Sequence, residues 1–237
     1  MHSRPRRLVK QSRARVYIAV ATVLVLTAAV GFYFINEGGQ KTAAIKPIIL
    51  YVNQGNGVVN VSNFASMAGY AISRGFNTVF FQVYREGNLL FTSAQLSAIV
   101  NESHSDGLKI FFALYFTNST QALPTTIYGL GEDGINLDMS TLTISDQLNL
   151  LADLQGSYHG QTAVTTTDMT SPLRPNLLVL ETYDTSLQQY IRHGRIASVG
   201  VFTTTSQQDY QSQRVYALQN SDGVMVFDYA GMLKAGY

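Results

Sequence analysis

One unit recurs along this chain of 237 residues: an apolar segment of strand length, a helix, a glycine and a second apolar segment. Gly75 and Gly107 end two such helices 32 residues apart, and Gly194 and Gly223 lie 29 residues apart. A βαβ unit takes about 30 residues, and glycine favours the left-handed conformation in which many helices end. The spacing therefore predicts parallel strands joined by helices.

The predicted strands are apolar on both faces, as in TVFFQVY, KIFFALYF and GVMVFDY, which favours a parallel sheet covered by helices. Seven strands are predicted, at residues 48–53, 78–84, 109–116, 161–168, 176–182, 196–203 and 224–229. Helices are predicted at residues 63–74, 93–106, 145–155, 185–193 and 206–219. Residues 117–144, with Pro124 and the glycines of YGLGEDG, are interpreted as a long insertion, and no final helix is expected.

These elements predict an α/β fold of the TIM-like (β/α)8 barrel type, with one strand unaccounted for; a doubly wound open sheet is the alternative. The chain has no cysteine, so packing of the core must stabilise this domain without disulfides. About 200 residues suffice, because a chain of that size buries roughly 70% of its unfolded surface.

A second feature is an uncharged apolar run at residues 16–35, VYIAVATVLVLTAAVGFYFI. As a helix it would be roughly 30 Å long, the thickness of a bilayer's hydrocarbon core. Six cations and no acid precede it, which places the N-terminus in the cytoplasm and the following residues across the membrane. A cleaved signal peptide is the alternative, but its apolar region is usually about 7 to 15 residues long and ends in small residues. We therefore expect a single-pass anchor whose partner is membrane lipid.

The expected organisation has four parts. Residues 1–15 form a basic cytoplasmic segment, residues 16–35 a transmembrane helix, residues 36–46 a polar linker and residues 47–237 an extracytoplasmic barrel-like domain. Beyond residue 15 the chain holds 10 Lys and Arg against 15 Asp and Glu. That acidic balance excludes nucleic acid as a partner, since phosphate binding needs a basic face.

Three segments resemble the glycoside-hydrolase-like barrel domains, in which a strand N-x-V-x-x-Q-V-R precedes Y-x-S and A-H-x-x-G-L segments. They are GFNTVFFQVYREGNLLFTS at residues 75–93, SHSDGLKIFFALYF at residues 103–116 and SDGVMVFDYAGM at residues 221–232. The matching positions are Asn77, Gln82, Val83, Phe91, Ser93, His104, Gly107 and Leu108. Arg85 stands one place later than the arginine of that pattern, and its middle D-G-I-x-x-D-Y strand is not identified in this chain. The resemblance implies a barrel fold and a carbohydrate-related activity.

Acids at the C-terminal ends of barrel strands are the candidates for chemistry, because barrel enzymes place their functional groups there. Glycoside hydrolysis needs two carboxyl groups, one protonated and one ionised. Glu181 and Asp228 are the first predicted pair, since each follows a strongly apolar strand that would raise its pKa, and Asp168 is a third candidate. For Asp184 and Asp222 a capping or turn role is favoured.

Side chains at other predicted strand ends are expected to bind substrate. They are Tyr84, Arg85, Glu86, Tyr115, Tyr183 and Tyr229. The tyrosine rings would offer faces for sugar stacking, although several of 14 tyrosines would lie at strand ends by chance, and the chain has no tryptophan.

No cofactor or metal is expected from the sequence. The four histidines show no ligand spacing, and cysteine is absent. The sequence lacks a G-x-S-x-G elbow and a P-loop, and the glycines of GLGEDG do not open a helix after a strand. Two functional hypotheses follow: an anchored glycosidase acting on a cell-surface or environmental glycan, or a non-catalytic surface domain that binds a glycan or a cell-envelope partner.

Overall fold

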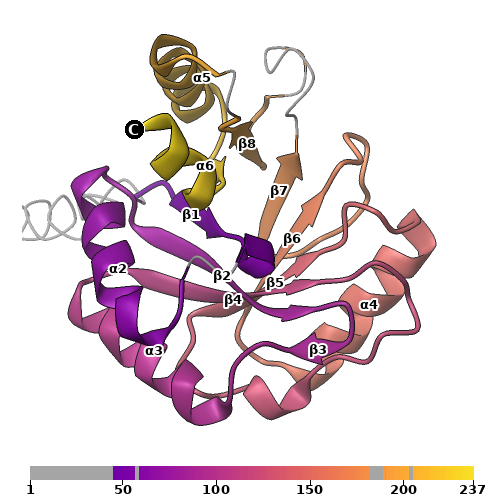
Figure 1. Ribbon diagram of the computed structural model, residues 1–237. Helices are drawn as coiled ribbons and strands as arrows, with labels where there is room; N and C mark the ends of the chain where they lie inside the picture. Colours follow the sequence, from indigo (N-terminus) through magenta and orange to yellow (C-terminus); the bar gives the residue numbers. More distant parts are fainter. Residues whose placement is uncertain (1–44, 57–58, 182–188, 190, 203–204) are drawn as a thin grey trace, which may run out of the picture. The chain divides into compact units, whose positions relative to one another are not determined.

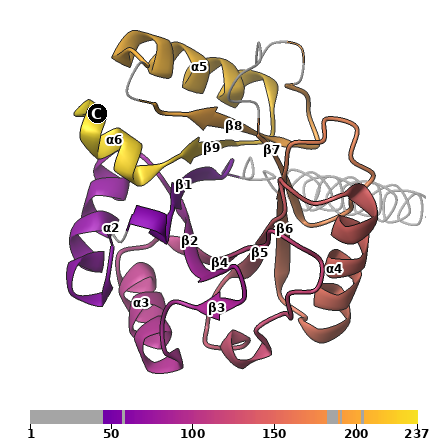
Figure 2. The same cartoon turned by 45° about the vertical axis from the view of Figure 1, so that its right-hand side comes forward.

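Eight parallel strands close into a ring in the computed structural model of the chain. The structure describes residues 45–56, 59–181, 189, 191–202 and 205–237, which lie almost entirely in one unit, Lys46–Tyr237. The parallel strands are β1 (Ile48–Val52), β2 (Thr78–Arg85), β4 (Lys109–Tyr115), β5 (Gly134–Asp138), β6 (Gln161–Thr166), β7 (Leu177–Glu181), β8 (Ile196–Gly200) and β9 (Val224–Phe227). Figures 1 and 2 show the ring with the helices outside it.

Pairing around the ring is continuous, because β1 pairs in parallel with both β9 and β2. The predicted adjacency of the first three long strands is confirmed: β1 pairs with β2, and β2 pairs with β4. The short β3 (Asn88–Leu89) returns antiparallel along the end of β2. This closure confirms the TIM-like barrel and excludes the open doubly wound sheet.

The helices follow the repeated unit at most positions. They are α2 (Phe64–Ser73), α3 (Ser93–Ser105), α4 (Ile144–Ser157), α5 (Gln207–Asn220) and α6 (Tyr229–Ala235). Asn60 caps the short 3-10 helix η2 (Val61–Asn63) through a capping box with Asn63, and α2 follows η2 directly. As predicted, Gly75 and Gly107 have positive φ, at 74° and 77°, and each follows the C-cap residue of its helix, α2 or α3.

Two predictions about the fold are wrong, and a third lies mostly outside the described residues. The eighth strand, β5, lies inside the predicted insertion 117–144, where the link from β4 holds only the 3-10 helix η3 (Thr125–Ile127). The final strand stops at Phe227, and α6 forms where no last helix was expected. The predicted helix 185–193 falls mostly outside the described residues, and its described end at 191–193 is not helical.

Two apolar layers hold the barrel together. Alternate residues of each strand point into the lumen, where Ile49, Phe80, Phe111, Val179 and Met225 pack. The intervening residues pack outward against the helices in a larger cluster. A Cβ built on Gly134 would overlap the ring of Phe111, so glycine at this position leaves room for the lumen aromatic. The C-terminal ends of the strands, beyond this lumen layer, form the mouth of the barrel.

Candidate active site at the barrel mouth

A cavity of about 230 Å³ opens at the C-terminal ends of the strands. It is lined by Tyr51, Asn53, Gln82, Arg85, Tyr115, Asp138, Ser140, Glu181 and Phe227. Six strands or their following loops contribute to this lining, and all but one of the residues are polar. This end of the barrel is where (β/α)8 enzymes carry their active sites.

Asp138 is the buried acid of the cavity, and the sequence analysis missed it. The alternation of β5 turns Ile135 and Leu137 into the outer core, so Asp138 faces the lumen, where it is 5% exposed. The sequence does contain a motif that could have identified it: Asp133, Gly134, Ile135 and Asp138 match the first six places of D-G-I-x-x-D-Y. The strand is hard to recognise from the sequence because it follows the glycine-rich YGLGEDG segment.

The hydroxyl of Tyr51 donates a hydrogen bond of 2.8 Å to Oδ2 of Asp138. Ser140 lies on the other side of the carboxyl group, with Oγ 3.4 Å from Oδ1. Burial raises the pKa of Asp138 to about 6, against the lowering effect of the hydrogen bonds from Tyr51 and Ser140. Burial favours the neutral carboxylic acid because it removes water from the charged form. Asp138 thus changes protonation state close to neutral pH.

Glu181 is the second acid of the cavity. It ends β7 two residues after Val179, which packs in the lumen, and therefore points to the same side. Glu181 is partly exposed and lines the cavity together with Asp138. Of the three acids predicted for chemistry, Glu181 alone lines this cavity.

Arg85 reaches the mouth because of a bulge in β2. The pairing of β2 with β4 runs regularly to Gln82 and resumes at Tyr84, so Val83 is an extra residue. Both Val83 and Tyr84 then face outward, and Arg85 faces the cavity beside Gln82. The bulge accounts for the arginine standing one place later than in the resembling pattern.

The predicted stacking role of Tyr84 has no support in this geometry. Tyr84 is 4% exposed, packs its ring 5.3 Å from that of Phe116, and donates its hydroxyl to the carbonyl of Ala122 at 2.9 Å. Sequence alternation alone would have turned it inward. The single inserted residue reverses the face on which it lies.

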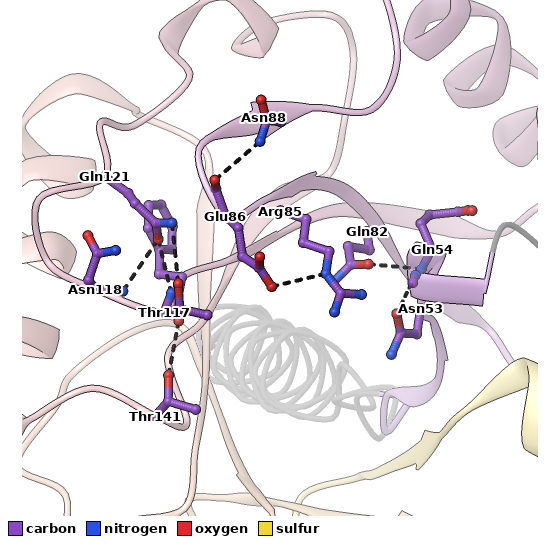
Figure 3. A network of polar contacts seen from close by, with 12 residues as sticks. Asn53, Gln54, Gln82, Arg85, Glu86, Asn88, Thr117, Asn118, Gln121 and Thr141 are labelled. Atoms are coloured by element: carbon purple, nitrogen blue, oxygen red, sulfur yellow. Dashed lines mark hydrogen bonds and ion pairs between the residues drawn. The ribbon is translucent and has the colours of Figure 1, made fainter.

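Arg85 has three close neighbours, Glu86, Tyr115 and Gly55, and Figure 3 shows its contact with Glu86. Its Nε lies 3.3 Å from Oε1 of Glu86, and its guanidinium lies 5.6 Å from the ring centre of Tyr115. A Cβ built on Gly55 would overlap Nη1 of Arg85, so the loop after β1 can approach the guanidinium because residue 55 is glycine. Burial raises the pKa of Tyr115, and the nearby charge of Asp138 raises it further.

Two amide side chains complete the cavity beside Arg85 (Figure 3). Oε1 of Gln82 accepts the backbone N–H of Gln54 at 2.9 Å, and Oδ1 of Asn53 accepts the backbone N–H of Gly55 at 2.7 Å. These bonds fix which end of each amide is oxygen. The nitrogen ends remain as hydrogen-bond donors in the cavity lining.

The other predicted site residues lie away from the cavity. Asp228 follows the inward-facing Phe227 and begins α6, where its Oδ1 accepts the N–H of Gly231 at 2.8 Å. Burial raises its pKa, as predicted, but its immediate role is to cap the helix. Asp168 accepts hydrogen bonds of 2.8 Å from both the N–H and the hydroxyl of Thr170 and organises its own loop.

Three further residues predicted to bind substrate do not line the cavity. Glu86 occupies the turn between β2 and β3 with a φ of 52°, and its carboxylate contacts Arg85, which lines the cavity. Tyr229 packs in the outer layer, its ring 5.3 Å from that of Tyr70. Tyr183 lies outside the described residues. Of the six predicted binding residues, Arg85 and Tyr115 line the cavity.

The described part of the chain lacks two other kinds of feature. No group of three or more His, Cys, Asp or Glu side chains that could hold a metal ion was found there. Nor does any helix in that part have the length and apolar character needed to cross a membrane. The predicted membrane helix 16–35 lies outside the described residues.

Comparison with known proteins finds the same barrel fold in several glycoside hydrolases. No family model and no curated protein matches the sequence. Among solved structures, a GH18 chitinase from the chitin utilization locus of Flavobacterium johnsoniae has a TM-score of 0.51 and 13% identity over 78% of this chain and 88% of its own. A GH113 β-1,4-mannanase has a TM-score of 0.53 and 9% identity over the same shares. A GH20 module of a pneumococcal exo-β-D-N-acetylglucosaminidase has a TM-score of 0.52 and 8% identity, with 78% of each chain covered.

At these identities the likeness establishes the fold alone. The described unit shares the (β/α)8 barrel of several glycoside hydrolase families. It agrees with the fold implied by the sequence resemblance.

Proposed function

We propose that the barrel domain is a glycoside hydrolase whose carboxyl pair is Asp138 and Glu181. The observation that carries this proposal is that two acids from different strands, β5 and β7, line one cavity at the barrel mouth. Fold neighbours that include a chitinase, a mannanase and an N-acetylglucosaminidase support a glycan as the ligand. At about 230 Å³, the cavity is smaller than the roughly 300–1,000 Å³ of sites for drug-sized ligands, which suits one sugar ring.

The environments of the two acids suggest their roles. Asp138, with a pKa raised to about 6, holds a proton in weakly acidic solution and can pass it to the glycosidic oxygen as the bond to the anomeric carbon breaks. Glu181, more exposed, acts as the carboxylate that assists attack at that carbon, directly or through water. Tyr51 positions Asp138 and limits how far its pKa rises. This division matches the one protonated and one ionised carboxyl group that the reaction requires.

The test is turnover by the full-length chain. Oligosaccharides built from N-acetylglucosamine, mannose and uronic acids would be incubated with it, and the products followed by proton NMR, which also identifies the anomer formed first. We expect cleavage of at least one class and loss of that cleavage in Glu181→Gln. Hydrolysis that persists unchanged in Glu181→Gln would contradict the proposed pair.

A non-catalytic glycan-binding domain is the second candidate. The observation in its favour is the enclosure of Asp138, which is only 5% exposed and has one carboxyl oxygen bonded to Tyr51. That geometry restricts the approach of a glycosidic oxygen. Binding of a glycan by the parent chain without any turnover would support this candidate over the hydrolase.

We also propose that the chain is anchored in the membrane through residues 16–35, with the barrel outside the cytoplasm. The uncharged run and the six cations before it support this location. Extraction of the full-length chain should require detergent, and protease added outside intact cells should digest the barrel. A soluble product beginning after residue 35 would instead identify a cleaved signal peptide.

A further inference from the structure

The polar groups of the cavity are divided between its strands. The acids Asp138 and Glu181 come from β5 and β7. Three polar side chains of β2 and β4, with the residue that follows β1, form what we call the donor wall: Asn53, Gln82, Arg85 and Tyr115. The hydroxyl groups of Tyr51 and Ser140 contact Asp138 instead. A ligand in the cavity therefore meets acids on one side and N–H or O–H groups on the other.

The donor wall has unused hydrogen-bonding capacity. The amide oxygens of Gln82 and Asn53 each already accept a backbone N–H, so the amide nitrogens are the groups of these side chains most available to a ligand. Nη1 and Nη2 of Arg85 and the hydroxyl of Tyr115 have no hydrogen-bond partner among the described residues. A neutral sugar hydroxyl both donates and accepts, whereas a carboxylate only accepts. A wall made mostly of donors suits the carboxylate.

Arg85 supplies the positive charge that a ligand carboxylate would pair with, and neighbouring residues already position its side chain. Its side chain is 38% exposed, its Nε is taken by Glu86, and its guanidinium rests near Tyr115 and Gly55. The two terminal nitrogens can therefore face a ligand together. A guanidinium binds a planar carboxylate through two parallel hydrogen bonds, which a lysine cannot reproduce.

We propose that the donor wall binds the carboxylate of an acidic sugar, so that the ligand of this site is a uronic-acid-type glycan. This assignment rests on the proposed function, because it takes the cavity to be the glycan site. The carboxylate lies against Arg85, with Gln82, Asn53 and Tyr115 as further donors. The sugar ring then extends toward Asp138 and Glu181.

Titration of the full-length chain in detergent tests the assignment, with ligand-observed NMR as the readout. The probes are glucuronic acid and galacturonic acid, each compared with its neutral counterpart, glucose or galactose. We expect the acids to bind roughly tenfold to 100-fold more tightly, the effect of added charge-assisted hydrogen bonds. Arg85→Gln should remove this difference, and Arg85→Lys should restore only part of it.

Arg74→Gln is the matched control. Arg74 also lies 5.6 Å from a tyrosine ring, that of Tyr70, but it follows α2 on the exposed outer surface, away from the cavity. It should keep the preference for the acids. Because one Arg is lost in both variants, a general effect of net charge would appear in both.

Three outcomes would overturn the assignment. Equal binding of acidic and neutral sugars by the parent would show that the site does not recognise a carboxylate. The proposal of a hydrolase acting on a neutral glycan would still stand. Equal loss of preference in Arg74→Gln and Arg85→Gln would place the effect outside the donor wall. If glucose 6-sulfate bound as tightly as glucuronic acid, the site would select anions in general and not a planar carboxylate. Turnover of a neutral glycan is measured separately, so failure of this inference and failure of the hydrolase proposal are distinguishable.

Discussion

The hydroxyl of Tyr51, on β1, donates a hydrogen bond of 2.8 Å to Oδ2 of Asp138, on β5, although the two strands are not neighbours in the sheet. This bond favours the ionised carboxylate, while burial favours the neutral acid. The balance leaves the pKa of Asp138 at about 6. Tyr51 therefore controls the pH range in which Asp138 can donate a proton.

Tyr51→Phe should raise the pKa of Asp138 further. The substitution removes a hydrogen bond to the charged form, worth on the order of 1 kcal/mol, or about one pKa unit. The measurement is a carboxyl carbon-13 NMR titration of Asp138 in the parent and the variant. A pKa that stays the same or falls would show that the hydroxyl does not stabilise the carboxylate.

Asp138→Asn should make the protein more stable at pH 8. The folded pKa of about 6 lies above the ordinary value of 3.8 for an aspartate, so the folded state binds more protons between these values. Stability from this group is therefore present below about pH 4 and is lost as pH rises through 6. Two pKa units correspond to about 3 kcal/mol, which sets an upper limit for the gain in the variant.

The measurement is the thermal midpoint of the parent and Asp138→Asn at pH 4 and pH 8. The difference between the two proteins should widen in favour of the variant at the higher pH. A variant that is less stable than the parent at pH 8 would mean that other groups of the folded protein offset the cost of burying the ionised carboxylate.

Asp228 should be replaceable by asparagine but not by alanine. Its Oδ1 accepts the N–H of Gly231 at the start of α6, and asparagine caps helices about as well as aspartate. We expect Asp228→Ala to lower the free energy of unfolding by about 1 kcal/mol and Asp228→Asn to change it little. Denaturant unfolding of both variants measures this, and equal losses would point to a role for the charge.

Gly55→Ala should weaken acidic-sugar binding without destabilising the fold. The added Cβ would overlap Nη1 of Arg85, at the mobile end of a long side chain that can move aside. Displacing the guanidinium should reduce the preference for glucuronic acid over glucose while the thermal midpoint stays within about 2 °C, the usual effect of a surface change. An unchanged preference would show that binding does not depend on the resting position of Arg85.

Most of the fold could be predicted because its signals are local. Glycines after helices and strands apolar on both faces identified the parallel units. β5 was missed because it is short, follows a glycine-rich segment and carries Asn136 and Asp138 on its inner face. Its polarity resembles a loop in the sequence, although all five residues are buried.

The site was harder to predict because it depends on which face each strand end presents. A bulge at Val83 moves Tyr84 outward and Arg85 inward, and no feature of the segment TVFFQVYR predicts this bulge. Asp228 follows a residue that faces the lumen, so strict alternation turns it toward the helices. Glu181 was predicted to lie at the mouth because its strand is regular.

The central claim is that Asp138, rather than Asp228, partners Glu181, and the most direct test compares the turnover of two conservative variants. On a glycan that the parent cleaves, Asp138→Asn should lower the rate by about 10² or more, the scale of general acid–base catalysis. Asp228→Asn, which keeps the helix cap, should retain a rate within a few-fold of the parent. Loss of turnover in Asp228→Asn, together with normal rates in Asp138→Asn, would contradict the account.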